Sequence, residues 1–105
     1  MGLYITGSIT ADPSRPATAV KTSVALSETS VVLLLANIDR RFASIFNASN
    51  RSLFVAFGAT ASLTDYTVEI PKASYFETQP DGYTGVISGI WATAGAGNAK
   101  ITEVS

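Results

Sequence analysis

Two apolar runs around a short polar break constrain the fold of this chain more than any other feature. Residues 40–57 read RRFASIFNASNRSLFVAF, with alternation over 42–46 and again over 53–57. A period of two is typical of β-strands, and two such runs around a polar turn predict a β-hairpin. Both faces of the runs carry large apolar residues. The hairpin should therefore lie centrally, with its own sheet partner on one side and another layer or subunit on the other.

Short alternating segments recur along the rest of the chain at spacings of roughly 8 to 12 residues. They lie at residues 3–6, 20–26, 31–36, 66–70, 74–78, 83–91 and 98–104. Turn signals such as Gln79-Pro80-Asp81-Gly82 separate them, and no stretch has a helical period. We predict an all-β fold, an antiparallel β-sandwich or jelly-roll-like domain of seven to nine short strands. The run at 31–36, apolar on both faces, should be a central strand.

The N-terminal residues differ from the remainder of the chain. The segment DPSRPAT holds two of the four prolines, which disfavours a helix or an interior strand. We expect an extended N-terminal arm over residues 1–18 and a β-sandwich domain over residues 19–105. Within the arm, Leu3, Tyr4 and Ile5 offer a short strand that should pair with an exposed sheet edge of a neighbouring subunit.

The composition combines high hydrophobicity with little charge. Hydrophobic residues make up 47% of the 105 residues and charged residues 14%, against about 25% charged in typical soluble domains. The chain is long enough for one core, in which we expect Phe46, Val55 and Trp91. Monomers seldom leave large apolar patches in water, so part of the surface should be covered by protein. We expect a homo-oligomer, specifically a trimer.

The net charge of −1 argues against nucleic acid or an anionic membrane as a partner. Affinity for either depends mainly on clustered Lys and Arg. The longest apolar run, VVLLLA, is far shorter than the roughly 20 residues that span a bilayer. The first residues also lack the basic start and long apolar region of a signal peptide, so export by that route is not expected.

The chain lacks residue types on which many catalytic and metal-binding sites depend. There is no histidine and no cysteine, which excludes disulfides, zinc–thiolate sites and histidine-based catalysis. Neither G-x-S-x-G nor S-x-x-K occurs, and no glycine-rich loop joins a strand to a helix. Asp65 and Glu69 have even spacing and could share a strand face, which would suit a glycosidase pair only if a second strand set the right separation, and solvent-facing acids are far commoner. We expect a protein that is not an enzyme and has no cofactor or metal site.

The candidate interface residues are those of the arm, the one basic pair and an aromatic residue. They are Leu3, Tyr4, Ile5, Arg15, Arg40, Arg41 and Tyr75. For Arg40 and Arg41, a solvated strand start or a pairing with Asp39 is a simpler role than phosphate binding. Tyrosine and tryptophan are enriched in interfaces and in sugar-stacking platforms, although core packing explains most of them here equally well.

A series of strand and turn motifs runs from Arg40 to Glu103. It consists of Arg40-Arg41, Ile45-Phe46-Asn47, Leu53-Phe54-Val55 with Phe57-Gly58, Tyr66-Thr67-Val68 with Ile70-Pro71, Tyr75 to Glu77, Tyr83-Thr84-Gly85 and Ile87-Ser88-Gly89-Ile90-Trp91. The series resembles a group of small proteins encoded among the structural genes of tailed bacteriophages. It covers about 60% of the chain and contains no catalytic signature.

The resemblance implies a virion accessory protein of the capsid decoration, or cement, kind, often a trimeric β-sandwich seated on the shell. We accordingly expect a virion structural protein that stabilises the shell by bridging capsomers. Its partners would be further copies of itself and the major capsid protein. It would be made in the host cytoplasm and located at the capsid surface. The alternative is a receptor- or glycan-binding module of a tail or head fibre, which predicts a concave cluster of Tyr, Trp and Asn.

Overall fold

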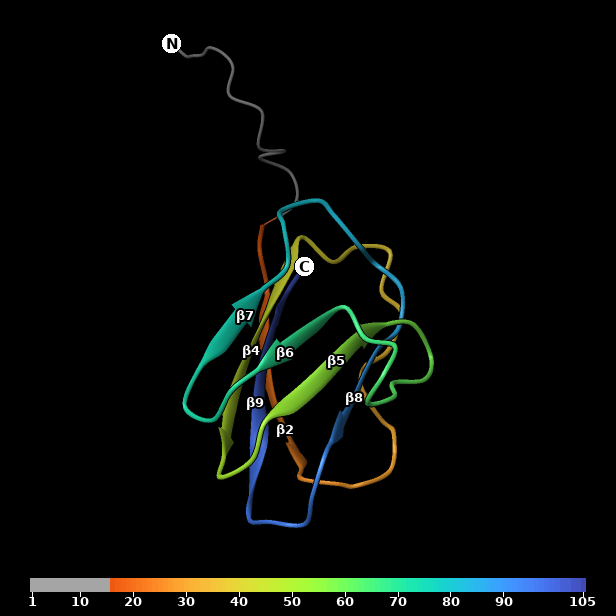
Figure 1. Cartoon of the computed structure of the whole chain (residues 1–105). Helices are drawn as coiled ribbons and strands as arrows, with labels where there is room; N and C mark the ends of the chain where they lie inside the picture. Colours follow the sequence, from red (N-terminus) through yellow and green to blue (C-terminus); the bar gives the residue numbers. More distant parts are fainter. Residues whose placement is uncertain (1–15) are drawn as a thin grey trace, which may run out of the picture.

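The computed structural model describes residues 16–105 and shows an all-β fold (Figure 1). The strands are β2 (Ala19–Ala25), β3 (Val31–Leu34), β4 (Phe42–Ser49), β5 (Leu53–Phe57), β6 (Val68–Ile70), β7 (Tyr75–Glu77), β8 (Ile87–Trp91) and β9 (Gly97–Val104). Strand numbering starts at β2, and the described residues contain no helix. The predicted all-β fold class is confirmed.

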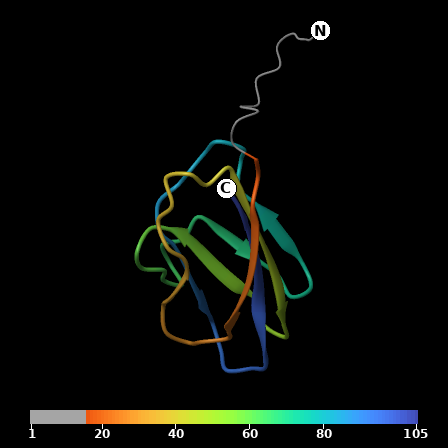
Figure 2. The same cartoon turned by 180° about the vertical axis from the view of Figure 1, so that it is seen from behind.

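The strands form two four-stranded antiparallel sheets. Sheet I has the order β2-β9-β4-β7 and sheet II has the order β3-β8-β5-β6. Figure 2 shows β2 and β9, in orange and blue, side by side although they come from opposite ends of the described chain. Apart from the pairing of β5 with β6, the sandwich is built from pairings between strands that are not consecutive in the sequence.

The core lies between the facing sides of the two sheets. Its largest fully buried side chains are Ile45 and Ile101 from sheet I, and Leu53, Ile70, Ile87 and Trp91 from sheet II. Gly89 of β8 lies close to this packing, since a Cβ there would lie 2.9 Å from the Cδ1 atoms of Leu33 and Leu53, and these side chains would have to shift. Removal of these side chains from water supplies the main stabilising term of the fold.

The predicted hairpin over residues 40–57 is wrong. Its two arms are strands, but β4 lies in sheet I and β5 lies in sheet II, so the short connection between them crosses from one sheet to the other. β4 pairs with β9 over eight residue pairs and with β7 on its other side. Both hydrogen-bonding edges of β4 are thereby used, and none is left for β5.

A buried polar network holds the chain at this crossing. The Nδ2 of Asn47 donates to the carbonyls of Arg51 at 2.7 Å and Ile70 at 2.8 Å. Ser49 Oγ donates to Asn47 Oδ1 at 2.6 Å and accepts from Trp91 Nε1 at 3.0 Å. Asn47 itself is fully buried. These bonds satisfy polar groups that would otherwise be costly inside the sandwich, and they tie β4 to three segments of the chain.

Two further expectations need correction. The run at 31–36 was expected to be central, but β3 is an edge strand of sheet II, and its Val32 and the following Leu35 are exposed. Val55 and Trp91 are buried as predicted, whereas Phe46 is 41% exposed. Alternate residues point to opposite faces of a strand, so the inward position of Ile45 forces Phe46 outward.

Candidate interaction surface

The structure describes three of the seven candidate interface residues, and these three differ in their exposure to solvent. Leu3, Tyr4, Ile5 and Arg15 lie outside the described residues, and so does most of the predicted arm. Of the remaining three, Arg40 is buried, Arg41 is half-buried and Tyr75 is 68% exposed. Tyr75 therefore keeps the exposure that an interface role requires, and Arg40 does not.

Arg40 is a structural anchor rather than a solvated residue at the start of a strand. Its Nε lies 2.8 Å from Oε2 of Glu103, and its partner is this acid rather than the expected Asp39. The guanidinium also donates to the carbonyl oxygens of Leu35, at 2.7 Å, Gly85, at 3.0 Å, and Tyr83, at 3.2 Å. One side chain thus joins the β3–β4 connection, the segment before β8 and strand β9 through charge-assisted hydrogen bonds.

Four cross-strand rows of side chains make up the outer face of sheet I, the face turned away from sheet II. The rows are Ala19 with Val104 and Phe42; Lys21 with Thr102, Ser44 and Glu77; Ser23 with Lys100, Phe46 and Tyr75; and Ala25 with Asn98 and Ala48. These side chains point outward because the alternate residues Ala43, Ile45 and Ala99 are buried in the core. None of the residues in these rows is buried.

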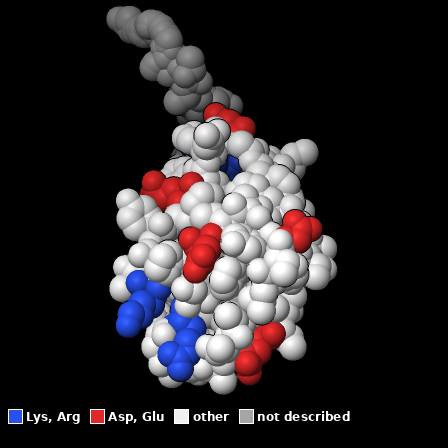
Figure 3. All heavy atoms as spheres, viewed as in Figure 1, with Lys and Arg blue, Asp and Glu red and all other residues white. Residues whose placement is uncertain are grey.

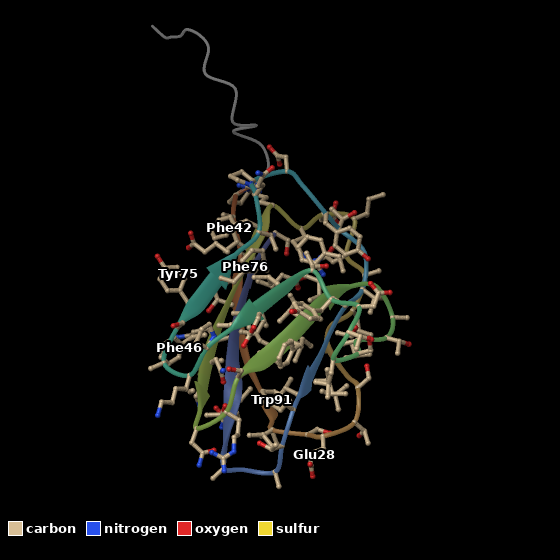
Figure 4. The ribbon with its side chains drawn as sticks, in the orientation of Figure 1. Glu28, Phe42, Phe46, Tyr75, Phe76 and Trp91 are labelled. Carbon is tan, nitrogen blue, oxygen red and sulfur yellow. The ribbon has the colours of Figure 1, made fainter. Side chains whose placement is uncertain are left out.

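Aromatic side chains dominate one side of this outer face. Figure 4 shows Phe42, Phe46 and Tyr75 along the β4 and β7 side of the molecule, while Trp91 lies between the sheets. Phe46 and Tyr75 are cross-strand partners in the register of β4 and β7. An exposed, adjacent aromatic pair on a regular sheet is a feature of docking surfaces rather than of a solvated face.

The outer face of sheet II is partly covered by its own chain. The β5–β6 loop, residues 58–67, folds over it and places the ring of Tyr66 edge-on to that of Phe54, with centroids 4.8 Å apart. Ser88 Oγ donates to the carbonyl of Gly58 at 2.9 Å, and the amide of Ala61 donates to Ser30 Oγ at 2.8 Å. This loop, called the covering loop below, fixes part of that face within the chain, although its own Leu63 and Tyr66 are exposed.

A second aromatic group lies at the β7–β8 side of the sandwich. The rings of Phe57 and Tyr83 stack with centroids 4.8 Å apart and an interplanar angle of 6°. With Phe76, Glu77 and Gln79 they line a shallow pocket of about 360 Å³. Stacked rings beside polar side chains offer the kind of surface on which a sugar can stack.

Charge and metal-binding groups contribute little to the surface. In the view of Figure 3 most of the surface is uncharged, and the acidic side chains are spaced apart rather than gathered in one patch. Among residues 16–105 there is no group of three or more acidic side chains that could hold a metal ion. In the same part of the chain, no helix has the length and apolar character needed to cross a membrane.

The residues of the sheet I face were mostly not predicted as interface residues from the sequence. Tyr75 was named, but Phe42, Phe46, Lys21 and Lys100 were not. A usable signal lay in the last strand, where Lys100 shares its parity with Thr102 and opposes Ile101. A lysine marks the solvent side of an antiparallel strand. Nothing local, however, showed that β4 would lie beside that strand.

Comparisons with known proteins add little to this description. No family model matches the chain, and no curated protein matches it. A solved chain from Bacillus endospore appendages, described as a novel family of disulfide-linked pili, is 14% identical, with a TM-score of 0.43. The match covers 92% of this chain and 96% of that chain. This low similarity assigns no function.

Proposed function

We propose that this protein is a non-enzymatic structural subunit that associates through its sheet I face, and that it acts as a capsid decoration protein of a tailed bacteriophage. The observation that carries the structural role is the uncovered outer face of sheet I, with Phe46 and Tyr75 side by side. The phage setting is supported by the resemblance of residues 40–103. In that setting the protein stabilises the shell by bridging capsomers.

The partners follow from this role. The protein contacts further copies of itself and the major capsid protein, at the capsid surface, after synthesis in the host cytoplasm. A low content of charged residues, 14%, supports burial of part of the surface against protein. The homotrimer expected from the sequence and the strand-forming role of Leu3, Tyr4 and Ile5 stay predictions.

Shell binding is the direct test. Purified protein is added to shells of the encoding phage that lack it, and bound protein is located by cryo-electron microscopy while shell melting is followed by calorimetry. The proposal expects density at regular positions between capsomers and a higher melting temperature of the shell. Density confined to the tail or fibres, or no binding to shells, contradicts it.

A glycan-binding fibre module is the second candidate. The pocket lined by Phe57, Phe76 and Tyr83, with Gln79 at its side, favours it. Trp91, which a sugar platform would expose, is fully buried and donates to Ser49 instead. A glycan array with the wild type and Gln79→Ala separates the two roles. Specific binding that is lost in the variant supports the fibre module, and its absence supports the structural subunit.

A further inference from the structure

The charged side chains of the sheet I face have a self-complementary arrangement. Its rows contain Lys21 on edge strand β2, Lys100 on β9 and Glu77 on edge strand β7. Lys21 and Glu77 belong to the same cross-strand row, with Thr102 and Ser44 between them. The row therefore runs from a positive edge to a negative edge through a neutral centre.

The strand order decides which symmetric pairing of two such faces is favourable. A two-fold axis parallel to the strands, passing between β9 and β4, places β9 over the partner's β4 and β2 over the partner's β7. Each row then lies over the same row of the partner, reversed from end to end. A two-fold axis perpendicular to the strands instead places each strand over its own copy.

The first arrangement places complementary groups of the two copies opposite each other. Lys21 lies over Glu77 of the second copy, and Lys100 lies over the ring of Phe46 of that copy, where cation–π attraction applies. Val104 lies over Phe42 in the next row. Each charged strand of the face carries charge of one sign only, so a perpendicular axis, which places each strand over its own copy, never brings a lysine over Glu77. Charge therefore favours the parallel axis.

We propose that two copies of this chain pack face to face through sheet I, related by a two-fold axis parallel to the strands. The pairing rests on the self-association stated above, and it does not depend on the capsid setting. Aligned sheets pack about 10 Å apart with strand directions within about 30°. Lysine and glutamate side chains are long enough to meet across that spacing despite the offset that such an angle introduces at the sheet edges.

Chemical cross-linking tests the pairing directly, because the chain contains no cysteine of its own. Sheets about 10 Å apart are too distant for a direct disulfide, so Lys21→Cys and Glu77→Cys variants are treated with a bismaleimide of matching length, separately and as a mixture. Cross-linked peptides are identified by mass spectrometry. The pairing expects the mixed cross-link to dominate, with little product from either variant alone. Dominant cross-linking of either variant to itself, or no cross-link, overturns it. Glu28→Cys mixed with Glu69→Cys is the control and should not cross-link.

Charge reversal gives an independent readout. Lys21→Glu and Glu77→Lys should each weaken self-association by about ten-fold, and the double variant should restore it, because both pairs are then reversed together. Lys72→Glu and Glu69→Lys, exposed charges outside these rows, are matched controls and should leave association unchanged. Failure of the double variant to restore association overturns the pairing.

The mass of the full-length protein in solution completes the test. Light scattering should give an even multiple of the 11.0 kDa chain mass, either a dimer or, if a three-fold contact is also present, a hexamer. A monomer at micromolar concentration or a plain trimer overturns the pairing. Shell binding is measured separately, so a protein that pairs without binding shells contradicts the capsid setting and leaves the pairing intact.

Discussion

The outer face of sheet II is partly covered by the chain's own loop, whereas none of the residues in the rows on the outer face of sheet I is buried. On sheet II, Tyr66 of the covering loop packs against Phe54 with ring centroids 4.8 Å apart and is itself 41% exposed. On sheet I, Tyr75 and Phe46 are 68% and 41% exposed. The difference shows that a loop can engage the aromatic side chain of one sheet face within the chain, while the aromatic pair of the other face stays in contact with solvent.

The largest expected effect comes from the core that both sheets share. Trp91→Ala should lower the free energy of unfolding by about 3–5 kcal/mol, because it removes a fully buried side chain and the hydrogen bond that this side chain donates to Ser49 Oγ. Chemical denaturation of both proteins measures the loss. A loss no larger than that of Tyr75→Ala would show that Trp91 is not in the core.

The next effect concerns Arg40, which was expected at the surface. Arg40→Ala should destabilise the fold by about 3 kcal/mol, since Glu103 and three carbonyl groups lose their partner. Replacing both members of the ion pair by methionine should cost less than the single change. Thermal melts of the two variants check this order. If Arg40→Ala has the same melting temperature as the wild type, the structural role of Arg40 is contradicted and the interface role that was predicted for it is favoured.

Tyr66 and Tyr75 allow the two outer faces to be compared with the same substitution. Tyr66→Ala should cost about 1 kcal/mol, because the edge contact with Phe54 is lost. Tyr75→Ala should change the stability of the single chain by less than about 0.5 kcal/mol. Urea denaturation at low protein concentration measures both. Equal losses of unfolding free energy would mean that the contact of Tyr66 with Phe54 stabilises the chain no more than the exposed side chain of Tyr75 does.

A small effect on the single chain is also expected for Phe46→Ala. Its loss should stay below about 1 kcal/mol at low protein concentration, because the ring is 41% exposed. The loss should grow with protein concentration, since an interaction between copies stabilises the folded state by mass action. Denaturation at two concentrations checks this, with Val55→Ala as the buried control, whose loss should not change. A concentration-independent loss would assign Phe46 to its own core.

The sequence predicted the positions of the individual strands better than it predicted which strands pair with each other. Residues 42–46 and 53–57 are strands, and the turns after Phe57 and before Tyr83 lie where Gly and Pro indicated. Their assignment to one hairpin failed because Asn47, a turn residue by composition, is buried and hydrogen-bonded to Arg51 and Ile70. A polar residue can be buried when distant carbonyl groups accept its hydrogen bonds, and no local pattern reveals those groups.

The candidate surface was predicted in part for a similar reason. Tyr75 was named from its residue type, and it is exposed on an edge strand. Arg40 was named from its basic neighbour, and it is buried by contacts with Leu35, Tyr83 and Glu103. These acceptors include positions more than 40 residues away in the chain, so the environment of Arg40 could not be inferred from adjacent residues.

By itself the sequence determined the all-β fold, the positions of most strands and the lack of histidine and cysteine chemistry, because these depend on local periodicity and on composition. Only the tertiary structure decided that β4 and β5 lie in different sheets and which face of each strand points inward. Strand pairing is a contact between distant segments, and a shift of one residue reverses every side chain. The exposure of Phe46 and the burial of Arg40 both follow from which strands pair and from which face of each strand points inward.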